Sequence, residues 1–183
     1  MRHGKGVYVY TKDPKSEEDE TPAKDRQTRY EGEWKDGAMH GIGKMTYPNG
    51  DVYFGTFARN NKHGNGSYTY KSNGDIYSGE FEHNEKHGEG TFLFGANNSQ
   101  LKGTWQQGEI TEGEWVHQDG TRYVGEFSGG RPIADGAFHS KLPAGKWNLQ
   151  EGEFIERAIE GADDEDEVEL IWQGRELKSY ADQ

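Results

Sequence analysis

The sequence predicts an all-β fold: a single-layer, twisted antiparallel meander of consecutive β-hairpins that ends in a flexible acidic C-terminal tail. A pattern of 23 or 24 residues recurs three times within residues 30–100, starting at Tyr30, Tyr53 and Tyr77. Within each copy, apolar or glycine positions alternate with polar ones, which is the period-two pattern of strands. The 27 glycines and 13% aromatic residues suit short strands and tight turns. A fixed period of this kind indicates a repeat architecture.

Each copy supplies two strands that are predicted to form one hairpin. In the first copy, Tyr30, Gly32 and Trp34 share one face of the first strand, and glutamates alternate with them on the other face. A turn is expected around residues 35–37, and the Asn-Gly pair at 49–50 is a strong signal for the turn into the next hairpin. The sheet should therefore have an aromatic-and-glycine face and a Ser/Thr/Glu/Lys face.

Glycines recur at fixed positions of the pattern, which are Gly32, Gly41 and Gly43 in the first copy. Glycine weakens a strand, so its regular recurrence needs a packing reason. We expect aromatic side chains to lie flat over these glycines. One copy is too small to fold alone, so neighbouring copies must supply the missing contacts.

The pattern divides the chain into five segments. Residues 1–10 are the second half of a repeat without its first half, so either the chain is a fragment or its opening strand pairs with another segment. The tail leaves two interpretations open, because Val168, Leu170 and Trp172 alternate as in a strand, whereas the dense acids before them favour disorder. The segments are a half repeat (1–10), a charged loop insertion (11–29), three regular repeats (30–100), degenerate repeats with a terminal half repeat (101–155) and the acidic tail (156–183).

Charge and composition argue against several classes of function. The chain of 183 residues has a net charge of −12, and residues 151–183 carry 12 acids and 3 bases. A protein that neutralises phosphates should instead be basic, so nucleic acid is not an expected partner. There is no cysteine, hence no disulfide and no thiol nucleophile. No apolar run approaches the ~18 residues of a membrane span, and we expect a soluble intracellular protein of one domain.

Histidine is the residue type most suggestive of a metal site, because His3, His40, His63 and His87 recur at one position of the pattern. Equivalent positions lie two strands apart, about 9.5 Å. That is too far for nitrogens that must each lie ~2.0–2.1 Å from a shared zinc ion. His117 and His139 have no nucleophile motif beside them, and there is no Gly-Lys-Ser/Thr phosphate loop. The sequence therefore predicts no enzyme, no metal and no cofactor.

Nine aromatic residues form a column along the repeated first strands, and they are the candidate partner-binding residues. One interpretation is internal: the rings cover glycines and hold the meander together. The other is a groove that receives a helix or an extended segment of another protein. A one-layer sheet leaves its apolar face partly uncovered, which favours a partner. The nine residues are Tyr30, Trp34, Tyr53, Phe57, Tyr77, Phe81, Trp105, Tyr123 and Phe127.

The repeated pattern is Tyr-x-Gly-x-Trp/Phe, a turn, Gly-x-Gly, an aromatic residue and then Asn-Gly, as at residues 30–50. This pattern resembles the MORN repeat (membrane occupation and recognition nexus). The order of the later features resembles one group more closely, the MORN-repeat subunits of the ciliary radial spoke head. These features lie at residues 90–94, 103–105, 123–127, 131–132 and 152–154, and an acidic run follows at 163–167.

The resemblance implies a non-enzymatic structural adaptor of the radial spoke head, whose sheet binds other spoke-head subunits in ciliary and flagellar motility. It also implies a location in the cytoplasm and its cytoskeleton, at the axoneme, with a surface facing the central pair of microtubules. The oligomeric state stays open.

The name of the repeat suggests an alternative function, the binding of anionic phospholipid head groups at a membrane. Juxtamembrane binding usually needs a cluster of about four to eight basic residues. Acids offset the lysines along the repeats, so a membrane is the less favoured partner. The lysines that could meet phosphates stand at positions 35, 44, 62, 71 and 86.

Overall fold

The computed structural model describes residues 1–11, 27–142, 146–158 and 168–181. None of these residues belongs to a helix, and accordingly none of them forms a helix able to span a membrane. The strands are β1 (Gly4–Thr11), β2 (Gln27–Lys35), β3 (Ala38–Thr46), β4 (Val52–Ala58), β5 (Asn61–Thr69), β6 (Ile76–Glu82), β7 (Glu85–Leu93), β8 (Gln100–Gln106), β9 (Glu109–Val116), β10 (Arg122–Ser128), β11 (Arg131–Leu142), β12 (Lys146–Ala158) and β13 (Val168–Ala181).

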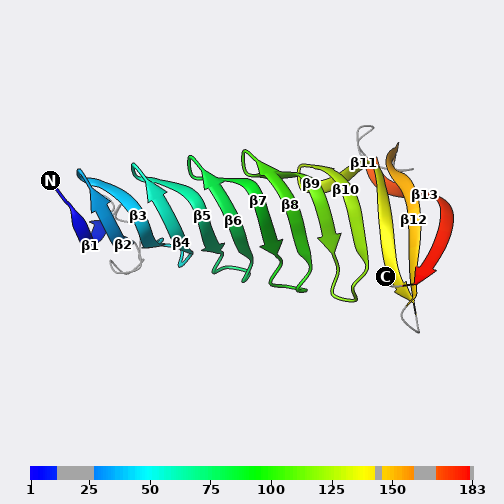
Figure 1. Cartoon of the computed structure of the whole chain (residues 1–183), viewed down its shortest axis with the longest axis horizontal. Coiled ribbons are helices and arrows are strands. Elements are labelled where there is room, and N and C mark those ends of the chain that lie inside the picture. The colour runs from blue at the N-terminus through cyan, green and yellow to red at the C-terminus, as the bar shows by residue number, and fades with distance from the viewer. Residues whose placement is uncertain (12–26, 143–145, 159–167, 182–183) are drawn as a thin grey trace.

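The 13 strands form one antiparallel sheet in which each strand pairs with its neighbours in the chain. Figure 1 shows them side by side along the longest axis of the molecule, from β1 in blue to β13 in red. The predicted open meander of consecutive hairpins is therefore confirmed. Alternation with period two gives each strand one apolar face, and the sheet gathers these faces on one side.

The hairpin turns are tight because both central residues adopt positive φ. These residues are Asp36 and Gly37 (φ 51° and 84°) between β2 and β3, and Arg59 and Asn60 (φ 50° and 72°) between β4 and β5. This is the geometry of type I′ turns, whose twist matches that of the flanking strands. The turn predicted around residues 35–37 is confirmed.

Each leading tyrosine lies over a pair of facing glycines. Gly32 of β2 pairs with Gly43 of β3, and a β-carbon added at Gly43 would lie 2.5 Å from the Tyr30 ring. The Tyr30 hydroxyl donates a hydrogen bond of 2.8 Å to the carbonyl oxygen of Glu33. The expected cover of glycine by aromatic rings is thus confirmed for Gly32 and Gly43, where only glycine leaves space for the ring.

Gly41 has a different role, and for this residue the expected ring cover is wrong. The pairing of β2 with β3 is irregular between Gly32 and Glu33, and Gly41 bulges there with a φ of 59°. A β-carbon at Gly41 would meet the carboxyl group of Glu33, not a ring. The residue is glycine because a left-handed backbone at a bulge favours it.

The predicted half repeat at residues 1–10 contributes one strand at the end of the sheet. Gly6 of β1 pairs with Gly32 of β2, so β1 continues the register of the glycine pairs. Thr11 belongs to β1 and residues 27–29 belong to β2, so the strands extend into both ends of the predicted loop at 11–29. Its middle, residues 12–26, lies outside the described residues.

The degenerate repeats keep the topology although their motifs decay. Leu101 takes the place of the leading tyrosine and is 5% exposed. Trp105 donates its indole N–H to the carbonyl oxygen of Gly90 at 3.1 Å, which connects this hairpin to the regular repeat before it. Changed side chains therefore fill the same position in the sheet without changing the order of the strands.

The tail predicted to be flexible over 156–183 is corrected for residues 156–158, which belong to β12, and for residues 168–181, which form β13. This strand pairs with β12 from Val168 opposite Ala158 to Ala181 opposite Lys146. The Trp172 ring packs within 4.8 Å of the Phe138 centroid and 5.2 Å of the Phe154 centroid. Ring packing therefore favours the strand that the alternation suggested. The acidic run within 159–167 lies outside the described residues.

Candidate partner-binding face

The nine predicted residues form an inner layer on the face of the sheet that carries the leading tyrosines, called here the aromatic face. All nine are buried, with exposed fractions between 0% and 5%. Their packing is the internal one, which holds the meander together. Their predicted contact with a partner stays a prediction, and the folded sheet leaves only their margins accessible. These inner rings are Tyr30, Trp34, Tyr53, Phe57, Tyr77, Phe81, Trp105, Tyr123 and Phe127.

The inner rings connect one repeat to the next. The Tyr53 ring meets Phe57 of its own hairpin edge-to-face at 5.1 Å, and meets Phe81 of the following hairpin at 5.0 Å. Tyr77 repeats this arrangement with Phe81 at 5.2 Å and Trp105 at 5.1 Å. Edge-to-face contacts of this kind are favourable for aromatic pairs, so the column stabilises the array along its length.

The hydroxyl groups of the leading tyrosines are held inside the sheet. The Tyr53 hydroxyl donates to the carbonyl oxygen of Thr56 at 2.9 Å, and that of Tyr77 donates to Glu80 at 3.0 Å. Burial raises the pKa of Tyr30 to about 12, with Glu33 adding to the shift. Burial likewise raises the pKa of Tyr53 and Tyr77. These phenols therefore stay protonated near neutral pH and act as structural donors.

A second layer of rings lies over the inner one and is only partly buried. Its members touch in series: Tyr47 and Tyr68 at 5.7 Å, Tyr68 and Tyr70 at 4.6 Å, Tyr70 and Phe92 at 5.8 Å, and Phe92 and Phe94 at 4.9 Å. We call these five residues the outer aromatic row. They come from the second strand of each hairpin or the loop just after it.

Two lysines stand among these rings. The Lys62 ammonium lies 4.8 Å from the Tyr68 centroid, 5.4 Å from Phe81 and 5.7 Å from Tyr53. The Lys86 ammonium lies 4.3 Å from the Trp105 centroid, and it also lies 5.1 Å from Phe92 and 5.7 Å from Tyr77. These distances are within the range of cation–π attraction. Desolvation lowers the pKa of both lysines, and Glu109 partly offsets this at Lys86.

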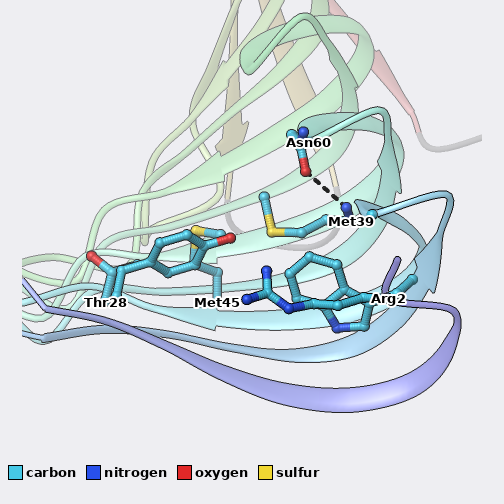
Figure 2. Close-up of a pocket in the computed structure, with 8 residues that line it drawn as sticks. Arg2, Thr28, Met39, Met45 and Asn60 are labelled. Atoms are coloured by element: carbon cyan, nitrogen blue, oxygen red, sulfur yellow. Dashed lines mark hydrogen bonds between the residues drawn. The ribbon is translucent and has the colours of Figure 1, made fainter.

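The aromatic face is hollowed at two places. One hollow, of about 360 Å³, is bordered by Lys86, Phe92 and Phe94 among others. The other, of about 550 Å³, lies at the β1 end and is lined by eight residues that include Arg2 and Met39. Figure 2 shows Asn60 reaching toward Met39 there, with its side-chain oxygen accepting the Met39 backbone N–H at 2.8 Å.

The family model of the MORN repeat matches residues 1–13, 30–52, 53–74 and 77–99. MORN repeats are thus detected in these four segments, which cover less than half of the chain. The matched segments cover β1 and the hairpins β2–β3, β4–β5 and β6–β7. They include all members of the outer aromatic row, and also Lys62 and Lys86. The match supports a repeat-based binding module.

Two of the MORN repeats end in Asn-Gly-Asp, and the aspartate of each bonds to the loop of the next repeat. Asp51, 6% exposed, accepts hydrogen bonds from the Tyr68 hydroxyl at 2.9 Å and from the Lys71 backbone N–H at 2.8 Å. Asp75 accepts the Gly95 backbone N–H at 2.8 Å in the same way. Desolvation acts to raise the pKa of Asp51, but its hydrogen bonds to Lys71, Tyr68 and Asn49 lower it overall.

The lysines considered for phosphate binding do not gather on one surface. Lys62 and Lys86 lie among the rings of the aromatic face, whereas Lys44 lines a hollow on the opposite face. That opposite face also exposes apolar side chains, with Ile42 and Phe54 at 55% and 58% exposure. Sequence reasoning did not single out this patch.

Histidine and carboxylate side chains are the candidate catalytic and metal-binding groups of the described residues. Among them, no group of three His, Asp or Glu side chains is placed to hold a metal ion. His87 approaches Glu82 at 3.4 Å, and the His63 and His83 ring centroids are 6.5 Å apart. What the MORN repeats do present is a row of partly covered rings with two embedded cations. Such a surface can bind a segment that is both apolar and charged.

Sequence reasoning missed the outer aromatic row as a candidate site. The second strands showed the alternation that places Tyr47 and Phe94 on the aromatic face, but the leading tyrosines formed the more regular column. The missing signal was which ring of a cross-strand pair covers the glycines. Tyr53 and Tyr68 pair across the strands, both two residues from the pair Gly55–Gly66, but the Tyr53 side chain is the one next to these glycines.

Proposed function

We propose that this chain is a non-enzymatic adaptor subunit of the ciliary radial spoke head, and that its aromatic face binds another protein. The observation that carries the proposal is the outer aromatic row of Tyr47, Tyr68, Tyr70, Phe92 and Phe94, which folding leaves only partly covered. A contiguous apolar surface of this kind usually marks an interaction site.

The assignment to the spoke head rests on the resemblance in the order of the degenerate repeats and the acidic run. On this proposal the partners are other spoke-head subunits, and the protein works at the axoneme, within the cytoskeleton of a cilium or flagellum. Part of its surface would face the central pair of microtubules. An extended sheet of consecutive hairpins suits a structural part that holds neighbours along its length.

Affinity capture from solubilised axonemes tests this proposal. The full chain should retain identified spoke-head subunits, and Tyr70→Ser with Phe94→Ser should reduce their recovery at least severalfold, because the row loses two of its rings. Phe54→Ser is the matched control, since Phe54 is an exposed ring on the opposite face. Recovery of no spoke-head subunit by the unaltered chain would reject the assignment.

Binding of anionic phospholipid is the alternative that the family name suggests. A net charge of −12 opposes it, as does the division of the lysines between two faces. Sedimentation with vesicles of phosphatidylcholine and phosphatidylserine at physiological salt distinguishes the two functions. We expect the chain to stay in the supernatant, and strong co-sedimentation would favour the lipid alternative.

A further inference from the structure

Lys62 and Lys86 occupy one repeated position that does not need a cation for folding. Each is the second residue of its strand, in β5 and β7, and the second residues of β3 and β9 are Met39 and Ile110. These two apolar side chains are 6% and 1% exposed. A side chain at this position therefore packs against the aromatic core, and in two of four consecutive hairpins that side chain is apolar.

A lysine at this position is held by rings and makes no salt bridge, although Glu109 lies near Lys86 and acts on its charge. Each ammonium lies within 6 Å of three ring centroids. Among the described residues, no carboxylate oxygen lies within 4.0 Å of either ammonium. Desolvation disfavours the charged form of both, and Glu109 offsets this only in part at Lys86, so the sheet keeps two partly desolvated cations without a salt bridge. A carboxylate brought from outside would gain more from such a cation than from a fully hydrated one.

We propose that Lys62 and Lys86 each bind a carboxylate of the partner, and that the segment occupying the aromatic face is an acidic amphipathic helix of another protein. This rests on the proposed function only in that the face must bind a protein. Because β5 and β7 are two strands apart, the two cations recur at about 9.5 Å along the sheet. On a helix, residues i and i+7 lie on one face and are separated by about 10.5 Å.

The residues between those two acids complete the match. Positions i+3 and i+4 of the same helix face the sheet, where the Tyr68 and Phe92 rings lie beside the two lysines. Leucine or another aliphatic residue at these positions would cover the rings that folding leaves exposed. The acids would then set the register of the helix along the sheet, which is the usual contribution of charge pairs to an interface.

A membrane or a nucleic acid fits these cations less well than an acidic peptide does. Anionic lipid surfaces are bound by clusters of about four to eight basic residues, whereas the aromatic rings surround only two lysines, Lys62 and Lys86. The chain also has a net charge of −12, which repels an extended polyanion. A short helix with two carboxylates needs only the two cations, and Glu109 is the acid that lies near one of them, Lys86.

Binding of matched synthetic peptides to the full-length chain tests the inference. The probe is a helical peptide with two glutamates seven residues apart and with leucines three and four positions after the first glutamate. The control peptide is identical except that glutamine replaces both glutamates. Fluorescence anisotropy should show the glutamate peptide binding about tenfold more tightly, as a well-placed charge pair allows. Lys62→Met with Lys86→Met should remove this difference.

The methionine substitutions copy the residue that the chain itself uses at position 39, so the thermal midpoint should not fall. Lys44→Met is the matched control on the opposite face, and it should preserve the tenfold preference. Equal binding of the two peptides, no binding of either, or a preference that survives in the double variant would each overturn the inference.

Sedimentation with anionic vesicles tests whether the two lysines bind lipid head groups instead of an acidic peptide. If the chain sediments with phosphatidylserine vesicles and the double lysine variant does not, the two cations serve a membrane and the inference is wrong. The outcomes also separate this inference from the proposed function. If the chain captures spoke-head subunits but does not prefer the glutamate peptide, the acidic helix alone is rejected. If it prefers the glutamate peptide but captures no spoke-head subunit, the spoke-head assignment alone is rejected.

Discussion

The Tyr53 ring lies so close to Gly66 of the neighbouring strand that a β-carbon added there would sit 2.6 Å from the ring carbon Cε2. Gly66 pairs with Gly55, and the Tyr53 hydroxyl reaches past both glycines to the carbonyl oxygen of Thr56. The same arrangement recurs at Tyr30 and Tyr77. The repeat is therefore built on a contact that tolerates no side chain at the glycine, and this leads to the first prediction.

Gly66→Ala should destabilise the protein by about 2–4 kcal/mol, because the added methyl group must displace the Tyr53 ring from its position in the core. The measurement is urea denaturation followed by circular dichroism. Gly6→Ala is the matched control, since a β-carbon at Gly6 would make only ordinary contacts of 3.7 Å with Trp34. A Gly66→Ala variant as stable as the control would contradict the tyrosine–glycine packing.

Alkaline pH should unfold the array by ionising its buried tyrosines. Burial raises the pKa of Tyr30 from its ordinary value to about 12. A group whose pKa is raised by folding keeps its proton better when folded, so its stabilisation is complete below about pH 10 and is lost as the pH rises through the folded pKa. Tyrosinate absorbance and circular dichroism should therefore change together above about pH 10. Complete tyrosine ionisation with an unchanged circular dichroism spectrum would contradict the burial of these hydroxyls.

Asp51→Asn should cost about 1–3 kcal/mol at neutral pH, because it weakens the hydrogen bonds that fasten the next loop. Folding lowers the pKa of Asp51, so its contribution is present above the ordinary pKa of a carboxyl group and is lost as the pH falls through the lowered one. The variant should accordingly lose less stability than the unaltered chain between neutral pH and about pH 3. Denaturant midpoints at both pH values measure this difference.

Asp75→Asn is the control for Asp51→Asn. Asp75 also accepts the backbone N–H of the next loop and the side chain of Asn73, but these bonds are exposed, whereas those of Asp51 are partly buried. Its replacement should cost less than that of Asp51. Equal costs for the two variants would mean that the tyrosine hydroxyl at Asp51 adds no stability.

Trp172→Ala should loosen the end of the sheet without unfolding the regular repeats. The Trp172 ring packs against Phe138 and Phe154, and its indole N–H donates to the Gln150 side chain at 3.2 Å. Loss of these contacts should speed amide hydrogen exchange in β12 and β13 and leave β4–β7 protected, because stability in a repeat array is local. Exchange that was already fast in residues 168–181 of the unaltered chain would contradict the pairing of β13.

The sequence was sufficient to predict the fold because its strongest signals are local. The recurrence of Tyr30, Tyr53 and Tyr77, the alternation around them and the turn residues at 35–37 each specify one hairpin, and neighbouring hairpins must pair. The bulge at Gly41 was not predicted, since a glycine with positive φ and a glycine under a ring look alike in a sequence. The strand at 168–181 was left undecided, because its partner rings Phe138 and Phe154 lie in other strands.

The candidate site was less predictable than the fold. Periodicity identified which rings share a face but gave no depth within that face, so it left open whether Tyr53 and Phe81 pack internally or bind a partner, and both lie in the core. Depth depends on how the sheet twists and on which ring covers which glycine pair. Lys62 and Lys86 also gain their significance only from three-dimensional packing, since the rings that surround each lysine come from three strands.

Site-specific photo-crosslinking in assembled axonemes tests most directly whether the aromatic face is the surface that binds a protein. A photoreactive phenylalanine analogue would replace Tyr70 in the outer aromatic row, and in a second variant would replace Phe54 on the opposite face. We predict a cross-link to a spoke-head subunit from position 70 and none from position 54. Cross-links from position 54 alone, or from neither position, would contradict a partner seated on the aromatic face.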